Sequence, residues 1–456
     1  MPSFYIETLG CQMNVLDSEL AASGLIQLGL SATESLRDAD VILFNTCSIR
    51  QHAEDKVYSA LGRLTGWRER NPGGVLGVLG CMAQKDQRLI FRRAPHVDFV
   101  LGPGQLDRLP GVVQALLLEK TEGRIPAKEL LVSLPRLERK HAEVVDSFRR
   151  YDPIRLPETR LRRFQALVRV MFGCDKFCSY CIVPSVRGPE QSRSPQEILD
   201  EVKTLTDQGV LEITLVGQTV NSYRFKEGEK TTRLADLLDK ICGVDGLRRV
   251  RFVTNYPRGM DDELLQAVRD LPKVGKHLHV PAQSGSDAVL QRMKRNYTVS
   301  DYRELIDRIY DTIPGVSMTS DFIVGFCGET EEEFTETIDL VKYGRFKNSF
   351  IFKYSARPGT KSAELFADDV PEPVKKRRNN ELLAVQDSIS LEMNRKFIGR
   401  KVDILVEGPD ELGNRLTGRT SCDRVVVFDG DSTLVGTFIE LDIVDAAPFT
   451  LAASGG

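Results

Sequence analysis

No apolar run in this sequence approaches the roughly 20 residues that a helix needs to cross a bilayer, so we predict no membrane association. The segment from Met1 to Glu7 lacks the basic and long apolar stretches of a secretory signal peptide. We therefore expect a cytoplasmic protein whose nine cysteines stay reduced and form no disulfides. An excess of positive charge is also missing, because the formal net charge is −3. Binding to nucleic acid would have to depend on local basic patches.

The remaining composition is that of a globular protein, with 41% hydrophobic and 28% charged residues. A chain of 456 residues exceeds the size that one core usually serves, so we expect two or three domains. Strand patterns at residues 4–9, 41–46 and 75–80 alternate with helical patterns at 14–28 and 53–67. This alternation predicts an α/β domain with a parallel sheet over residues 1–118.

Two further domains are predicted beyond a polar connector, residues 119–163, in which we expect some helix. The strand and helix pattern of residues 164–395 predicts an incomplete (β/α)6 barrel. A basic helix is expected after its last strand, from Pro373 to Phe397. The strands of this barrel are expected at 166–172, 212–216, 249–253, 277–280, 318–324 and 348–353. Residues 396–447 contain strand patterns only, at 402–407, 415–420, 425–428 and 438–444. They predict a small all-β barrel, an architecture that often binds oligonucleotides.

Three cysteines, Cys174, Cys178 and Cys181, lie in one short loop after the first strand of the predicted (β/α)6 barrel. Thiolates grouped in this way suit soft metal centres, and three of them leave one site of a cubane cluster open. The alternatives are a structural zinc site and buried free cysteines. Zinc normally has a fourth Cys or His ligand, which this loop does not supply.

The C-x3-C-x2-C spacing, with Tyr180 before the last cysteine, resembles the radical S-adenosylmethionine (SAM) superfamily. The resemblance implies that the open iron binds SAM and that an electron from the cluster splits SAM into methionine and a 5′-deoxyadenosyl radical. It also suggests SAM contacts at Gly217, Gln218, Gln283, Ser284 and Gly325, although these short motifs are equally compatible with ordinary turns between strands and helices.

A second set of cysteines, Cys11, Cys47 and Cys81, follows directly on the three predicted N-terminal strands. Because parallel strands end at one edge of a sheet, we expect these thiols to converge there. Gly10 and Gly80 are interpreted as room for a bulky group such as a cluster. The alternative is three small buried side chains. Three further cysteines, Cys242, Cys327 and Cys422, have no partner at ligand spacing and are predicted to be non-ligands.

The two cysteine sets together resemble the methylthiotransferase family over essentially the whole chain. That resemblance implies an auxiliary 4Fe-4S cluster in the N-terminal domain, a radical SAM barrel and a C-terminal TRAM domain. The segments from Gly10 to Glu19 and from Asn45 to Arg50 look like the branch that acts on isopentenyladenosine at tRNA position 37. In the other branches, which act on a ribosomal-protein aspartate or on threonylcarbamoyladenosine, the residues after the first cysteine differ from Gln12-Met13. Thr219 and Cys327 depart from the family's usual residues.

The resemblance further implies methylthiolation of C2 of the adenine with two SAM molecules and two 4Fe-4S clusters. The expected partners are tRNA, an electron donor such as flavodoxin or ferredoxin, and a sulfur source or cluster-repair protein. The alternatives are a methylthiotransferase acting on threonylcarbamoyladenosine in tRNA or on a ribosomal-protein aspartate, and a non-catalytic RNA-binding protein with a structural cluster.

Basic residues concentrate in the predicted all-β barrel, and a basic run from Lys375 to Arg378 precedes it. In an acidic protein this concentration favours a surface for RNA phosphates, although such runs are usually only solvated. The candidate RNA contacts are Lys401, Arg415, Arg419 and Arg424. Arg187 and Arg193, after the cluster loop, are candidates for contacts with SAM or RNA phosphate, or for salt bridges.

Overall fold

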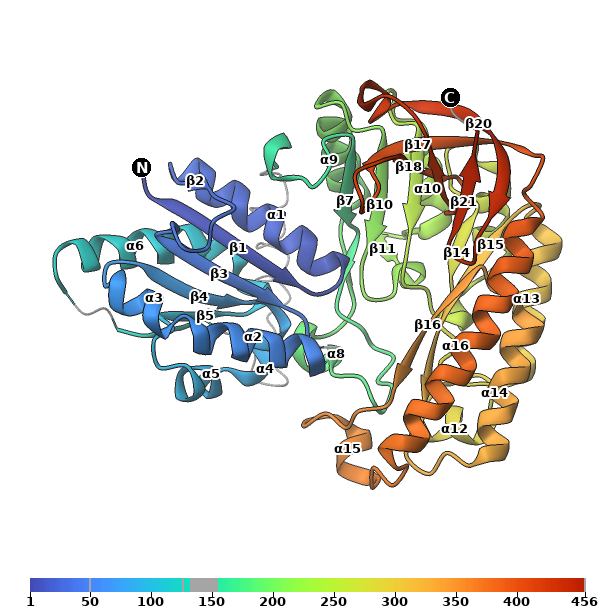
Figure 1. The fold of residues 1–456 in the computed structure, drawn as a ribbon, viewed down its shortest axis with the longest axis horizontal. Helices are drawn as coiled ribbons and strands as arrows, with labels where there is room; N and C mark the ends of the chain where they lie inside the picture. The colour runs from blue at the N-terminus through green and yellow to red at the C-terminus, as the bar shows by residue number, and fades with distance from the viewer. Residues whose placement is uncertain (49–50, 125–126, 132–154, 455–456) are drawn as a thin grey trace. The chain divides into compact units, whose positions relative to one another are not determined.

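The computed structural model describes residues 1–48, 51–124, 127–131 and 155–454, which Figure 1 shows as a ribbon. The described chain divides into two compact units. The first consists of Met1–Leu161, Leu167–Asp175 and Ile182–Arg193, and the second of Arg162–Ala166, Lys176–Cys181 and Ser194–Gly456. Ile49 and Arg50, together with residues 132–154 of the predicted connector, lie outside the described residues. No helix among the described residues is long and apolar enough to cross a membrane.

The first unit contains a six-stranded parallel sheet with the order β2-β1-β3-β4-β5-β6. Its strands are β1 (Ser3–Leu9), β2 (Ser31–Ala32), β3 (Val41–Thr46), β4 (Val75–Leu79), β5 (Phe99–Leu101) and β6 (Glu129–Leu131). Strands β3 and β4 are buried along their whole length. Burial on both faces explains why their sequences are nearly continuous apolar runs.

The helices of the first unit are α1 (Gln12–Gln27), α2 (Gln51–Arg63), α3 (Thr65–Arg70), α4 (Gly80–Asp86), α5 (Arg88–Arg93) and α6 (Leu109–Thr121). The short elements η1 (Pro103–Arg108), η2 (Pro157–Thr159), β8 (Met171–Phe172), α8 (Val183–Arg187) and β9 (Gln191–Ser192) also belong to it. A core forms where Phe44 and Val78 of the sheet pack with Leu61 of α2 and Trp67 of α3.

Three strands of this sheet were not predicted, namely β2, β5 and β6. Each has only two or three residues, which is too short for an alternation of apolar and polar residues to be recognised. Strand β6 lies in the predicted connector and pairs in parallel with β5, so this part of the connector belongs to the sheet.

The six predicted strands of the (β/α)6 barrel are present as two three-stranded parallel sheets, with the orders β13-β10-β7 and β14-β15-β16. They are β7 (Gln165–Arg169), β10 (Glu212–Val216), β13 (Arg249–Phe252), β14 (His277–His279), β15 (Ser317–Val324) and β16 (Asn348–Lys353). A hairpin that was not predicted, β11 (Arg224–Glu227) with β12 (Lys230–Arg233), follows β10 and the short η3 (Val220–Ser222).

The helices between these strands are amphipathic, and each buries one apolar face. They are α9 (Pro195–Asp207), α10 (Leu234–Cys242), α11 (Asp262–Asp270), α12 (Asp287–Arg292), α13 (Val299–Thr312) and α14 (Glu331–Gly344), with η4 (Pro257–Gly259) and α15 (Lys361–Leu365) as short additions. The predicted basic helix is α16 (Glu372–Arg395), which lies along β16 and α14 (Figure 1).

The C-terminal strands close into a barrel with the order β17-β18-β19-β21-β20. They are β17 (Lys401–Pro409), β18 (Leu416–Thr420), β19 (Val425–Phe428), β20 (Phe438–Ala446) and β21 (Thr450–Ala453), with η5 (Ser432–Leu434) before β20. Strand β21 was not predicted and lies beyond residue 447, where the predicted domain ends. It closes the barrel by pairing in parallel with β19 and antiparallel with β20.

Candidate functional site

The carboxyl ends of β1, β3 and β4 place three cysteines at one edge of the N-terminal sheet. Leu9 is paired with Thr46, and Asn45 is paired with Leu79, so the three strands end level with one another. Cys11, Cys47 and Cys81 follow these ends, and the N–H of Cys47 donates to the Leu9 carbonyl at 3.0 Å. Cys47 and Cys81 are buried, whereas Cys11 is exposed. The predicted edge for these thiols is therefore present.

Two buried asparagines connect the three turns that carry these cysteines. The Asn14 amide donates to Asn45 Oδ1 at 3.0 Å, and the Asn45 amide donates to the Asn14 carbonyl and to Ser18 Oγ, both at 2.9 Å. A Cβ at Gly80, whose φ is +89°, would lie 2.4 Å from Asn45 Oδ1, and one at Gly10 would lie 2.4 Å from Asn14 Oδ1. Both glycines thus make room for these amides, and the interpretation that they also make room for a cluster stays a prediction.

The three thiols influence one another electrostatically. A hydrogen bond with the Cys47 sulfur, assisted by the charge of Arg187, lowers the pKa of the Cys11 thiol to about 6. Burial raises the pKa of the Cys81 thiol, and Arg187 opposes that rise. The thiols and the Arg187 guanidinium are therefore close enough to interact electrostatically.

The donor set at this edge fits a cubane iron–sulfur cluster. Three thiols converge, which leaves one iron without a protein ligand. Among the described residues, no three His, Cys, Asp or Glu side chains are gathered tightly enough to hold a single metal ion. This is compatible with a cubane, because each thiolate there binds a different iron and the ligands are more widely spaced.

The second cysteine set lies in the loop between β8 and α8, and the chain passes from one compact unit to the other within this loop. In the first unit, the N–H of Cys174 donates to the Gly188 carbonyl at 3.0 Å. In the second unit, the N–H of Cys181 donates to the Cys178 carbonyl at 3.0 Å. Ser179 anchors this part of the loop by donating to the carbonyls of Met293 and Arg292.

Arg295 provides the loop with a buried cation that sequence reasoning missed. Its Nη1 donates to Cys178 Sγ at 3.3 Å, and its Nη2 donates to the Pro281 carbonyl at 2.9 Å. The guanidinium lies 4.6 Å from the ring centre of Tyr256 and 5.0 Å from that of Tyr297. The guanidinium thus donates a hydrogen bond to the Cys178 sulfur from a buried position between two aromatic rings.

The predicted SAM contacts lie at the carboxyl ends of three strands of the (β/α)6 barrel. Gly217 and Gln218 follow β10, Gln283 and Ser284 follow β14, and Gly325 follows β15. This is the end at which (β/α) barrels generally bind ligands. All five residues therefore follow the carboxyl end of a barrel strand, and their contact with SAM stays a prediction.

The turn after β14 has strained backbone, because Gln283 is not glycine but has a φ of +75°. Its N–H donates to the Asp321 carbonyl at 2.8 Å, and its carbonyl accepts from the N–H of Ile323 at 2.9 Å. Ser284 Oγ lies 3.3 Å from Thr337 Oγ1. Strand β15 and helix α14 therefore hold this turn in its strained conformation.

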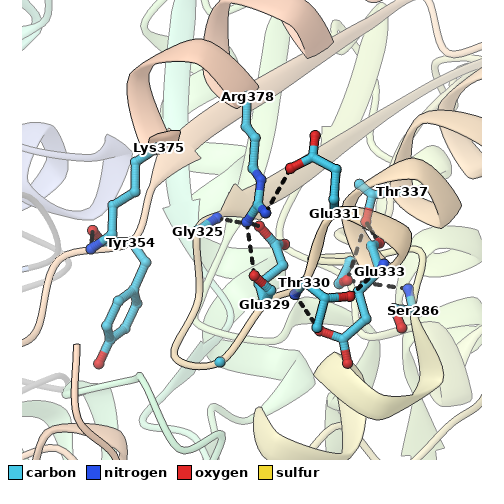
Figure 2. A network of polar contacts seen from close by, with 12 residues as sticks. Ser286, Gly325, Glu329, Thr330, Glu331, Glu333, Thr337, Tyr354, Lys375 and Arg378 are labelled. Carbon is cyan, nitrogen blue, oxygen red and sulfur yellow. Dashed lines mark hydrogen bonds and ion pairs between the residues drawn. The ribbon is translucent and has the colours of Figure 1, made fainter. Parts of the chain in front are cut away.

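Gly325 lies in the polar network shown in Figure 2. Its φ is +68°, and a Cβ there would lie 2.3 Å from Lys375 Cγ, so this position requires glycine. The Gly325 N–H donates to Glu329 Oε2 at 2.6 Å, and Arg378 Nη1 donates to the same oxygen at 2.8 Å. Burial raises the pKa of Glu329 to about 7. Lys375 and Arg378 are thus buried and brace this turn, which corrects their assignment to an RNA-binding surface.

The four predicted RNA contacts differ in how exposed they are and in which partners they have. Lys401 and Arg415 are exposed. Arg419 forms ion pairs with Glu407 at 3.2 Å and Asp423 at 3.1 Å. Arg424 is buried, donates to the Asn394 side chain and lies 4.5 Å from the ring centre of Phe397. Arg424 is therefore corrected to a structural residue, since a guanidinium with no exposed surface cannot bind a phosphate.

Asp423 explains why basic residues concentrate near the C-terminal strands. It forms ion pairs with Arg251 of β13 at 3.0 Å and with Lys347 at 2.6 Å, in addition to Arg419. The neighbouring His277 and these cations hold the pKa of Asp423 well below its usual range, despite the opposing effect of burial. Part of the basic pattern therefore joins the C-terminal barrel to the (β/α)6 barrel.

Several site residues besides Arg295 carried no assigned role at the sequence level. Asn14, Asp17 and Ser18 are buried polar residues on one face of α1. The sequence contained a sign of their importance, because these polar residues occupy a helix face on which apolar side chains would normally pack against the sheet. Arg187 and Arg193 are also buried. Arg187 forms an ion pair with Asp17 at 2.9 Å, which confirms the salt-bridge alternative for this residue, and Arg193 donates to the Arg169 carbonyl at 2.7 Å.

Three family models match the chain. The model described as the radical SAM superfamily matches residues 168–341. The model described as uncharacterized protein family UPF0004 matches residues 3–102, which carry the N-terminal cysteines. The TRAM domain model matches residues 395–454, a range that includes strand β21.

Comparison with curated proteins gives relatives that align over nearly the whole chain. A tRNA-2-methylthio-N(6)-dimethylallyladenosine synthase of Rhodopirellula baltica is 53% identical over 98% of this chain and 94% of its own. A protein of the same name from Syntrophotalea carbinolica is 44% identical over 98% of each chain. Among solved structures, the radical SAM methyltransferase TsrM of Kitasatospora setae aligns with a TM-score of 0.53 and 14% identity, over 80% of this chain and 74% of its own. That likeness concerns the fold.

Proposed function

This chain belongs to the family of tRNA-2-methylthio-N(6)-dimethylallyladenosine synthases, and we propose that it methylthiolates C2 of N6-isopentenyladenosine at position 37 of tRNA. Relatives of that name align over 98% of the chain, and the radical SAM and TRAM models match its middle and C-terminal parts. The observation that carries the proposal is the presence of two separate cysteine sets, one at the N-terminal sheet edge and one in the barrel loop.

Cys174, Cys178 and Cys181 would hold the cluster that binds SAM, and Cys11, Cys47 and Cys81 would hold an auxiliary cluster. When bound, the two clusters and SAM supply the radical, the sulfur and the methyl group that the modified base acquires. The chain's own part is to orient the thiols through Asn14, Asn45 and Arg295. The SAM contacts would be Gly217, Gln218, Gln283, Ser284 and Gly325, because each of them follows the carboxyl end of a barrel strand.

Binding of the tRNA would involve the C-terminal barrel, in which Lys401 and Arg415 are exposed. A base in the single-stranded anticodon loop can be turned out into an active site at modest cost. The protein would act in the cytoplasm. It would depend on an electron donor such as flavodoxin or ferredoxin, and on a sulfur source or cluster-repair protein.

Mass spectrometry of tRNA nucleosides tests this function. A strain lacking the gene should accumulate isopentenyladenosine without its 2-methylthio group, and the wild-type gene should restore that group. The Cys47→Ala gene should not restore it, and Cys242→Ala, at a predicted non-ligand cysteine, is the control. Loss of the methylthio group from threonylcarbamoyladenosine or from a ribosomal-protein aspartate instead would identify one of the alternative substrates.

A further inference from the structure

Arg187, at the end of α8, is a buried cation in contact with one of the N-terminal cysteines. Only 1% of the residue is exposed, and its Nε donates to Cys81 Sγ at 3.2 Å. Its Nη2 forms an ion pair with Asp17 at 2.9 Å. The guanidinium also lies 5.4 Å from the ring centre of Phe172. A charge buried in this way needs partners, and a cysteine sulfur is one of those it has.

Asp17 fixes the position of this arginine and is itself fully buried. It lies on α1 and also pairs with Arg169 at 3.3 Å. Two guanidinium groups therefore share this carboxylate, which holds Arg187 in the position from which its Nε reaches the Cys81 sulfur.

We propose that Arg187, oriented by Asp17, is a positioning residue for the auxiliary cluster: it hydrogen-bonds the Cys81 sulfur and raises the cluster's reduction potential. This inference rests on the proposed function, which places a cluster at Cys11, Cys47 and Cys81. It gives Arg187 a task that involves neither SAM nor an RNA phosphate.

The direction of the effect follows from charge. Reduction adds an electron to the cluster, and a nearby positive charge in a buried environment stabilises that added negative charge. Hydrogen bonds to cluster sulfurs act in the same direction. Partners beyond the ligands also orient the ligands, so removal of Arg187 should weaken retention of iron as well.

The test uses full-length protein carrying Cys174→Ala, Cys178→Ala and Cys181→Ala, so that iron can be bound only at the N-terminal thiols. Arg187→Met and Arg187→Lys are added separately to this parent. Arg155→Met is the matched control, because Arg155 is also buried in the first unit and pairs with the carboxylate of Glu19 at 2.8 Å. Each protein is reconstituted anaerobically, its iron is counted, and its midpoint potential is measured by redox titration.

Arg187→Met should lower the midpoint potential or lose iron relative to both the parent and Arg155→Met. Arg187→Lys, which keeps the charge, should retain more iron and have a potential between those of Arg187→Met and the parent. Equal potential and iron content in Arg187→Met and Arg155→Met would overturn the inference. Equal loss of iron from Arg187→Met and Arg155→Met would also overturn it, because the loss would then result from removing any buried arginine and not from losing the contact with Cys81. A parent without iron would instead contradict the two-cluster function, whatever Arg187 does.

Discussion

The two cysteine sets differ in how the chain brings their thiols together. Cys11, Cys47 and Cys81 follow three strands that are distant in sequence, and they converge only because the sheet aligns the strand ends. Cys174, Cys178 and Cys181 are neighbours in one loop. Each set nevertheless has a buried arginine on one sulfur, Arg187 on Cys81 and Arg295 on Cys178. The first set should therefore be sensitive to changes across the sheet edge, and the second mainly to changes in its loop.

The largest expected effect separates the tasks of the two sets. Cys178→Ala should abolish both reductive SAM cleavage and methylthiolation, because it removes a ligand of the SAM-binding cluster. Cys47→Ala should still release 5′-deoxyadenosine under strong reductant but form no methylthio product. Chromatography of the nucleosides measures both. Normal methylthiolation by the Cys47 variant would contradict the role given to the N-terminal set.

Iron content tests whether the two sets act independently. Two cubane clusters require about eight irons per chain, and the variant without the three loop cysteines should retain about four. The same number should remain in the variant without Cys11, Cys47 and Cys81. A colorimetric iron assay after anaerobic reconstitution gives these values, and a complete loss of iron from either variant would show that one set cannot form its cluster alone.

Asn45→Leu should disturb the N-terminal set while leaving the loop set intact. It removes hydrogen bonds to the side chain and carbonyl of Asn14 and to Ser18, and each buried polar group left without a partner costs about 1–3 kcal/mol. Iron content should therefore fall toward half, with SAM cleavage retained. The matched change in the loop is Ser179→Ala, which removes one hydrogen bond to Arg292 and should lose less iron. Full iron in Asn45→Leu would show that the asparagine network is dispensable.

Arg295→Met should lower the reduction potential of the loop cluster, by the charge argument made for Arg187. The measurement uses protein lacking Cys11, Cys47 and Cys81, so that only the loop cluster titrates. Arg292→Met serves as the control, because Arg292 pairs with Glu333 at 2.7 Å. If both variants behaved alike, the hydrogen bond to Cys178 would have no special effect.

The smallest effects concern RNA. Lys401→Ala and Arg415→Ala should each reduce the salt dependence of tRNA binding by about one unit of slope, because each removes one phosphate contact. Filter binding at several salt concentrations measures the slope, and Arg269→Ala, at an exposed arginine on α11, is the control. Unchanged slopes would mean that the C-terminal barrel binds RNA through other residues or has another role.

Much of the fold could be predicted because its longer strands and helices have clear apolar periodicity. β3, β10 and β16 were predicted with the ends they have, whereas the short strands β2, β5 and β6 were missed. Strand β21 was also missed, although it closes the C-terminal barrel. Short strands are defined by their neighbours in the sheet, and a single sequence does not contain that information.

The sequence by itself determined the spacing of the two cysteine sets and, through the predicted strands, the sheet edge at which Cys11, Cys47 and Cys81 lie. Only the tertiary structure decided which polar residues serve those thiols. Arg187 was a candidate for contacts with SAM or RNA phosphate or for a salt bridge, and Arg424 for an RNA contact, yet both are buried in polar contacts. The physical reason is that a residue's charge is a local property, whereas its burial and its partner depend on elements that are distant in the chain.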